Sequence, residues 1–266
     1  MPQNTHLEMI EAEAERVPQG AKETAPDFES LRRNAEEIVR ALAWNPGAHT
    51  SRFFSVRWNA MAAALRPVLE RVNRTKRSAS EADDIRWLRE NMPLLWAELG
   101  NTKNAFKRLR RLPHVRTPRG TTIPRVAAVA EAFLHAVSFD FSENAFVAYF
   151  GAFQESTVLK FRELWALIAA MELALLEQIA ARGRRLLDDA DSGTSQGIGI
   201  CVRSLREINQ LHWKEVLEPQ IAFDKVLRED PVGAYSRMDF DTRNLYREKL
   251  VKIAERSDST EMEVAS

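Results

Sequence analysis

The five histidines and the single cysteine are the side chains that would first suggest a metal site or a nucleophilic site. No two of the histidines have the i, i+4 spacing that places two ligands on one face of a helix, and none neighbours Cys201. A nucleophilic cysteine needs a nearby base, and the sequence does not point to one. We therefore interpret the histidines as ordinary surface or core residues and predict no metal site. The histidines are His6, His49, His114, His135 and His212.

Glycine-rich motifs that would bind phosphates or present a serine nucleophile do not occur in the sequence. There is no P-loop, no GxGxxG after a strand and no GxSxG elbow. The pair Gly197 and Gly199 stands alone and is interpreted as part of a linker. The sequence therefore predicts no cofactor and no catalytic residue.

Three carboxylates, Glu163, Glu172 and Glu177, lie in one strongly apolar segment and could suggest an acid–base pair. At about 100° per helical residue, Glu163 and Glu172 face opposite sides, and Glu172 and Glu177 are about 140° apart. This geometry disfavours a catalytic pair. Two interpretations remain open, which are buried ion pairing with Arg125 or Arg182, and simple exposure to solvent.

Residues 101–125 contain eight basic residues and no acidic one. They could contact anionic lipid head groups, at about 1 kcal/mol for each basic residue near the surface, or nucleic-acid phosphates. The third interpretation is a solvated loop that pairs with acidic neighbours in the fold. Nucleic acid is not expected, because Phe106 is the only aromatic residue there and the whole chain is balanced, with 38 basic and 38 acidic residues. The candidate contacts to an anionic surface are Lys103, Lys107, Arg108, Arg110, Arg111, Arg116 and Arg119.

The apolar segment Phe161–Ala181 must position the residues around it. Its apolar side chains continue almost all the way round a helix, which is typical of a helix covered by other helices. A central carboxylate in a membrane-spanning helix costs about 2.5–3.5 kcal/mol, and this segment has three. The sequence thus predicts a central buried helix and no membrane span.

The composition indicates an all-α fold. Ten glycines and eleven prolines in 266 residues are few for a turn-rich β protein. We predict an irregular multi-helix bundle around the central helix, with no sheet. One cysteine excludes an intrachain disulfide, and the acidic N-terminus lacks the apolar region of a secretion signal. The predicted divisions are a disordered tail (1–26), a helical bundle (27–186), a linker (187–199), a C-terminal helical part (200–256) and a second disordered tail (257–266).

Local signals predict where the helices begin and end. Asp27 is a candidate N-cap for a first helix, and Asn45-Pro46-Gly47 would end it. Pro93 should kink or break the helix that starts at Ser80, and Ser142 should cap another. The later helices are expected at 200–210, 213–228 and 241–256.

Several stretches, taken in order, are similar to one family. They include Phe161–Leu167 (FRELWAL), Val202–Leu205, His212–Lys214 and, most specifically, Asp230–Arg247, which reads DPxGxYxxMDFxTRxxYR. In this order they resemble the N-terminal region of the cyclic β-1,2-glucan synthases, over roughly residues 84–260. These large bacterial inner-membrane proteins build cyclic glucans from UDP-glucose.

The departures from the family pattern limit what the resemblance implies. Ile168 stands where the family has proline, Glu172 where it has arginine, and the linker 187–199 is shorter. The glucosyltransferase domain, the membrane spans and the phosphorylase-like domain of the family have no counterpart in this sequence. No catalytic residue is therefore carried over.

The resemblance implies a non-catalytic helical scaffold, cytoplasmic and peripheral to the inner membrane, with a membrane glucosyltransferase or an anionic lipid surface as partner. An independent helical adaptor is the alternative, and a glycan-active enzyme is the weakest interpretation. The oligomeric state is open. The block at 230–247 would act as a structural joint that locks two helices at a fixed angle. Its residues are Asp230, Pro231, Gly233, Tyr235, Met238, Asp239, Thr242, Arg243, Tyr246 and Arg247.

Overall fold

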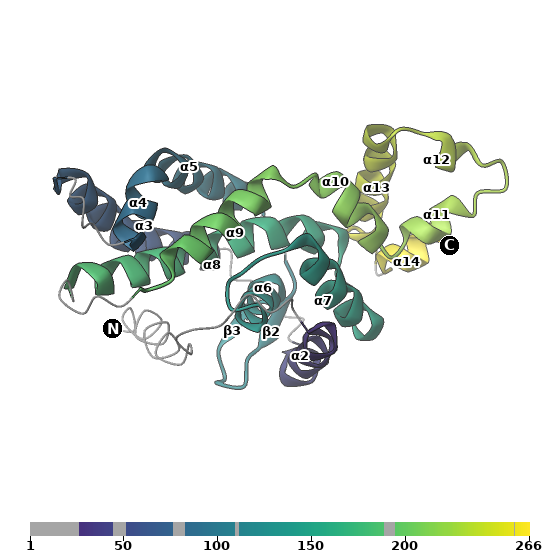
Figure 1. Ribbon diagram of the computed structural model, residues 1–266. Helices are drawn as coiled ribbons and strands as arrows, with labels where there is room; N and C mark the ends of the chain where they lie inside the picture. Colours follow the sequence, from purple (N-terminus) through teal and green to yellow (C-terminus); the bar gives the residue numbers. More distant parts are fainter. Residues whose placement is uncertain (1–26, 45–51, 77–82, 110–111, 189–194, 258) are drawn as a thin grey trace.

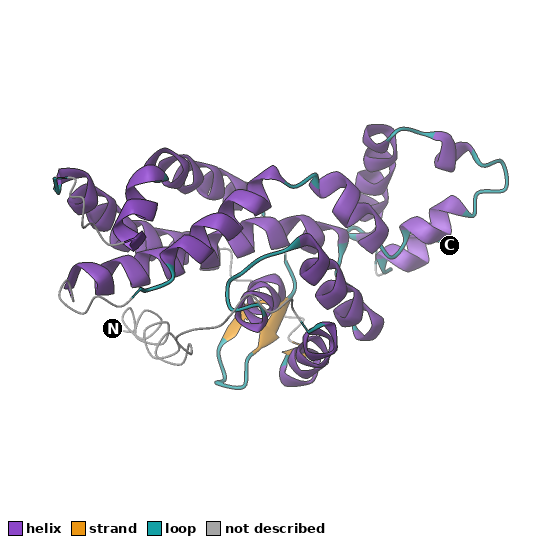
Figure 2. Cartoon of the chain, in the orientation of Figure 1, coloured by secondary structure: helices purple, strands orange, loops and turns teal. Residues whose placement is uncertain are grey.

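A computed structural model describes residues 27–44, 52–76, 83–109, 112–188, 195–257 and 259–266. Thirteen α-helices account for most of these residues, which confirms the all-α class. Figures 1 and 2 show them as an elongated body. The first eight are α2 (Phe28–Ala41), α3 (Phe53–Arg74), α4 (Asp83–Glu90), α5 (Met92–Arg108), α6 (Arg125–Ala136), α7 (Glu143–Ser156), α8 (Phe161–Asp188) and α9 (Ile198–Gln210). The others are α10 (Trp213–Leu217), α11 (Asp224–Arg228), α12 (Ala234–Arg237), α13 (Phe240–Ala254) and α14 (Glu261–Ala265), with a 3-10 turn at Glu218–Gln220.

Helix α8 is the centre of the molecule, as the sequence predicts, and extends to Asp188. It packs against α3, α6 and α9, and also against α5 and α4. Figure 1 shows α8 and α9 side by side, with α3 to α5 at one end of the molecule and α11 to α14 at the other. By length and composition α8 is apolar enough to cross a membrane, but 89% of its most apolar window is buried inside the protein. Covering helices therefore account for its hydrophobicity.

Local signals at several helix ends are confirmed. The Asp27 side chain accepts a hydrogen bond from the Glu29 amide at the start of α2, and Ser142 accepts one from the Ala145 amide at the start of α7. The helix predicted across Pro93 is broken into α4 and α5, with Pro93 in the first turn of α5. Such a position suits proline because a first-turn amide has no partner within the helix.

A small sheet differs from the prediction of a purely helical fold. Strands β1 (Ala43–Trp44), β2 (His114–Arg116) and β3 (Thr122–Pro124) pair antiparallel in that order. Trp44 lies opposite Val115, which in turn lies opposite Ile123. Two or three residues are too few to show an alternating pattern, so the sequence had no signal for these strands.

The structure describes both ends of the predicted linker, residues 187–188 and 195–199. Helix α8 occupies 187–188, and the Asp84 carboxylate of α4 accepts hydrogen bonds from the amides of Gln196 (2.5 Å) and Ile198 (2.9 Å). Helix α9 then packs along α8 and α4. The remaining residues of the linker, 189–194, lie outside the described residues, as do the predicted tail 1–26, the Asn45-Pro46-Gly47 turn and the Ser80 cap.

The C-terminal region also differs from the prediction. The helix expected at 213–228 is divided into α10, the 3-10 turn and α11. Pro219 lies in that turn, where proline ends one helix before the next begins. The tail expected to be disordered contains α14, which opens with a capping box between Thr260 and Glu263. The capping box and packing against the remainder of the C-terminal region stabilise this short helix.

Candidate functional site

The three glutamates of α8 are all buried, and each has a different environment. Glu163, at the start of the helix, forms a two-point ion pair with Arg125, whose Nε lies 2.9 Å from Oε1. This confirms the predicted pairing with Arg125. Arg125 also donates to the Val158 carbonyl (3.0 Å) and stacks over the exposed Trp44 ring at 5.2 Å. The arginine therefore joins β1, the α7–α8 connection and α8.

Glu177 lies about four turns further along α8, on nearly the same side as Glu163, and shares Arg57 with Glu131. Arg57 comes from α3 and Glu131 from α6, so this ion triad joins three helices. Burial alone would lower the pKa of Arg57, but the two carboxylates outweigh burial and raise it above its ordinary value. Arg57 is a fixed positive charge in the protein interior. The role of Glu131 and Glu177 is therefore to pair with this buried charge and hold the three helices together.

Glu172 has no basic partner among the described residues. Burial, followed by the charge of Glu98 on α5, raises the pKa of Glu172 to about 8, and the Thr102 hydroxyl only partly opposes this shift. Both glutamates are buried, and Oε2 of Glu98 has no hydrogen-bond partner among the described protein groups. The sequence did not predict this repulsion between two buried carboxylates, because Glu98 and Glu172 are on different helices.

The residues of the predicted joint surround one buried charge network. Arg247 donates to the carboxylate of Asp224 and to the Tyr235 hydroxyl (3.0 Å), and it also pairs with Glu218. Arg243 pairs with Glu218 through Nε at 2.8 Å. Burial disfavours the charged form of Asp224, but hydrogen bonds from Tyr235, Arg228 and Arg247 outweigh burial and lower the pKa of Asp224.

Asp230 of the same block stabilises the turn that precedes α12. Asp230 accepts hydrogen bonds from the amides of Val232, Ala234 and Tyr235 at 2.8–3.2 Å. Gly233 has φ +64°, a left-handed conformation that favours glycine. Pro231 is exposed in this turn.

At the start of α13, Asp239 is the N-cap and accepts hydrogen bonds from both the amide and the hydroxyl of Thr242. The Met238 carbonyl accepts a hydrogen bond from Arg243. Tyr246 is half exposed and packs edge-on against Tyr235. The structure therefore brings most of the predicted joint together, while its acidic partners Glu218 and Asp224 lie outside the block that the resemblance highlighted.

The basic residues of 101–125 are spread over a helix and a hairpin. On α5, the Lys103 ammonium lies 4.5 Å from the Trp58 ring, and Lys107 donates to Asn104 at 3.1 Å. Arg116 and Arg119 are exposed on the β2–β3 hairpin. Arg110 and Arg111 lie outside the described residues, and the side chain of Arg108 is not described. The described basic residues form two small groups rather than one patch.

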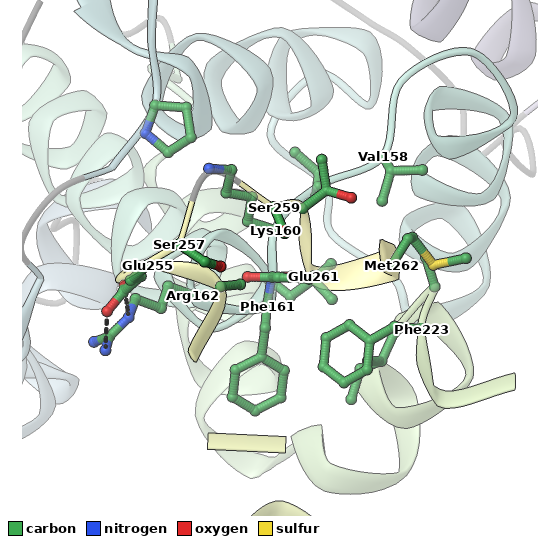
Figure 3. A pocket seen from close by; sticks show the side chains of 17 residues that line it. Val158, Lys160, Phe161, Arg162, Phe223, Glu255, Ser257, Ser259, Glu261 and Met262 are labelled. Carbon is green, nitrogen blue, oxygen red and sulfur yellow. Dashed lines mark hydrogen bonds and ion pairs between the residues drawn. The ribbon is translucent and has the colours of Figure 1, made fainter. Parts of the chain in front are cut away.

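A cavity of about 560 Å³ lies at the start of α8. Figure 3 shows Phe161, Phe223 and Met262 of α14 among the apolar side chains that line it. Among its charged side chains, Arg162 pairs with Glu255 at 2.7 Å, and Glu261 accepts a hydrogen bond from the Phe161 amide at 3.0 Å. Burial raises the pKa of Glu261. This cavity therefore combines a largely apolar lining with one carboxylate, Glu261, whose pKa is raised.

Sequence comparison relates the chain to one curated protein. No protein-family model matches the sequence. The chain is 24% identical over 269 aligned positions to the cyclic beta-(1,2)-glucan synthase NdvB of Rhizobium meliloti (strain 1021), and the alignment covers 70% of this chain. The chain spans only 9% of the length of that relative. The chain is therefore similar to a short part of a protein that is named for glucan synthesis.

Proposed function

We propose that this chain is a non-catalytic helical scaffold that supports the synthesis of a cyclic β-1,2-glucan from UDP-glucose. The catalytic partner would be a membrane glucosyltransferase, and the chain would lie on the cytoplasmic side of a bacterial inner membrane. The similarity to NdvB supports a link to glucan synthesis. The scaffold role is our inference from the way the chain uses its charged residues.

The observation that carries the proposal is the network around Arg247. Residues 230–247 are the part of the sequence that most specifically resembles the synthases. In this block Arg243 and Arg247 are paired with Glu218 and Asp224, and Arg247 is completely buried. Buried ion pairs of this kind fix the relative positions of helices, and their groups are not available to a substrate. This use of the block favours a structural role.

Co-purification and synthesis assays together test the proposal. A tagged chain expressed in its own host should retain a membrane glucosyltransferase after detergent extraction. Membranes from a strain without the chain should form less β-1,2-glucan from radiolabelled UDP-glucose, and added chain should restore synthesis. The Arg247→Met variant should restore less, while Arg237→Met, which changes an exposed arginine nearby, should restore as the wild type does.

Two results would contradict the scaffold. Turnover of UDP-glucose by the purified chain alone would make it an enzyme. Unchanged glucan synthesis in the deletion strain, with no glucosyltransferase retained, would favour the independent adaptor. That second candidate has one observation of its own, which is the exposed apolar face of α13 formed by Leu245, Tyr246 and Ile253.

A further inference from the structure

Helix α13 exposes large apolar side chains on the face that points away from the protein. Leu245, Tyr246 and Ile253 are 60%, 50% and 56% exposed. A peripheral helix normally confines such residues to its inner face. The inner face of α13 is already complete, because it buries Arg247, Leu250, Val251 and Ala254. Of these three outer residues, Tyr246 packs edge-on against Tyr235 with one side of its ring, while Leu245 and Ile253 remain mostly exposed beside the described residues.

Basic residues share the outer face with these apolar side chains. Lys249, Lys252 and Arg256 are exposed, and none of them forms an ion pair with any residue that the structure describes. Lys249 instead lies 5.9 Å from the Tyr246 ring. At 100° per residue, Leu245, Tyr246, Lys249, Lys252 and Ile253 fall within an arc of about 120°, and Arg256 follows in the turn directly after the helix. We call these six residues, Leu245, Tyr246, Lys249, Lys252, Ile253 and Arg256, the outer face of α13.

Three exposed acidic residues, Asp241, Glu248 and Glu255, flank this face on one side. Asp241 pairs with Lys214 at 2.6 Å, Glu255 pairs with Arg162 at 2.7 Å, and Glu248 accepts a hydrogen bond from Asn244, so none of them forms an ion pair with the three basic residues of the face. The outer face is therefore both apolar and positively charged. Figure 1 places α13 at one end of the molecule, beside α12. Val232, in the turn before α12, is also 74% exposed.

We propose that the outer face of α13 binds the surface of an anionic lipid bilayer. Three features favour lipid over a protein partner. The face is a single convex helix and not a groove. Two of its three cations are lysines, which are depleted in protein interfaces but can extend their charge to head groups while their stems lie along apolar surface. Leu245, Ile253 and the amphipathic Tyr246 suit the boundary between head groups and acyl chains.

This surface is distinct from the one that the sequence suggested. On α5, Lys103 and Lys107 share a face with one exposed large apolar residue, Trp96, and Lys103 is already held against the Trp58 ring. The outer face of α13 has three exposed apolar residues and three unpaired cations. The inference does not depend on a role in glucan synthesis.

The first experiment measures binding of the purified full chain to vesicles. Wild-type chain should bind vesicles that contain phosphatidylglycerol and should bind those of phosphatidylcholine alone far more weakly. Changing Lys249, Lys252 and Arg256 to glutamate should weaken binding to the anionic vesicles on the order of 100-fold, since each basic residue near a membrane contributes about 1 kcal/mol. The matched control changes Arg33, Arg71 and Lys76 to glutamate, which are exposed elsewhere and have the same summed charge. This control and the pair Lys103→Glu with Lys107→Glu should weaken binding much less.

A fluorescent label reports which face touches the lipid. Ile253→Cys provides an attachment point, because the natural Cys201 is completely buried. An environment-sensitive label at position 253 should shift to shorter wavelength on anionic vesicles. The same label on Val56→Cys, at a residue of α3 that is 62% exposed, should not shift.

Several outcomes would overturn the proposal. These are no binding of the wild-type chain to anionic vesicles, equal losses in the α13 and control triples, or a shift at position 56 without one at 253. A shift at position 253 caused by an acidic amphipathic peptide, with none caused by vesicles, would make the face a protein-docking surface instead. Circular dichroism of each variant excludes unfolding as the cause of a loss.

Discussion

Arg247 and Asp224 form a buried ion pair between α13 and α11, with the arginine Nε 2.9 Å from the aspartate Oδ1. Arg247 is completely buried, and Asp224 is 4% exposed. Removing one partner of such a pair leaves an unpaired charge in the interior, which typically costs about 3–5 kcal/mol. The pair is also the centre of the network that holds Tyr235, Glu218 and Arg228.

Arg247→Met should therefore lower the free energy of unfolding by about 3–5 kcal/mol. Urea denaturation followed by circular dichroism would measure this loss. Arg237→Met is the matched control, because Arg237 is exposed and, among the described residues, donates one hydrogen bond, to the Val232 carbonyl, so the change should stay within about 0.5 kcal/mol. Equal urea midpoints for the two variants would show that the network does not stabilise the fold.

Glu172 should make stability depend on pH. Its pKa in the folded protein, about 8, lies above the ordinary value of 4.5. Between these values the folded state holds a proton that the unfolded state releases, so the free energy of unfolding falls as pH rises from about 5 to 8. At about 1.4 kcal/mol per pKa unit, the loss across this range is on the order of 3 kcal/mol.

Glu172→Gln should remove the part of the pH dependence of stability that comes from Glu172. Compared with wild type, the variant should be more stable at pH 8 and show a smaller difference at pH 5, in urea titrations at both values. Glu98→Gln should give part of the same increase in stability at pH 8, because the charge of Glu98 contributes to the raised pKa of Glu172. A stability difference between Glu172→Gln and wild type that is the same at both pH values would contradict the shifted pKa.

Gly199 allows α9 to approach Trp87 of α4 very closely. A Cβ atom at position 199 would lie 2.6 Å from the indole Nε1. Gly199→Ala should therefore force the indole or the helix to move and destabilise the protein by about 1–3 kcal/mol. Gly100→Ala is the control, because nothing lies within 4 Å of the added atom in α5, and alanine should stabilise that helix by about 1 kcal/mol. Thermal unfolding of both variants should show opposite shifts, and a parallel shift would exclude the steric explanation.

The hydrogen bond from the Phe161 amide to Glu261 should protect the start of α8. Glu261→Ala removes the acceptor, and a hydrogen bond of this kind contributes about 0.5–1.5 kcal/mol. Amide exchange at Phe161 should then become faster, by roughly threefold to tenfold. Glu215→Ala, at an exposed site on α10, is the comparison and should leave the exchange at Phe161 unchanged. Unchanged exchange in Glu261→Ala would mean that α14 does not hold this end of α8.

The sequence by itself determined the features that depend on neighbouring residues. The caps at Asp27 and Ser142, the break at Pro93 and the continuous apolar surface of 161–181 are such features. Each is set by groups within a few residues along the chain, so spacing and residue type suffice to predict it. The pairing of Glu163 with Arg125 was also foreseen, as one of two interpretations.

Only the tertiary structure decided which distant side chains meet. It brought Glu98 to Glu172, supplied Asp224 and Glu218 to Arg247, and paired Trp44 with Val115 in a sheet. It also showed that the apolar residues of α13 lie on two faces, one buried and one exposed. These contacts depend on how helices cross and how far each is rotated about its axis, and packing across the whole core sets both of these.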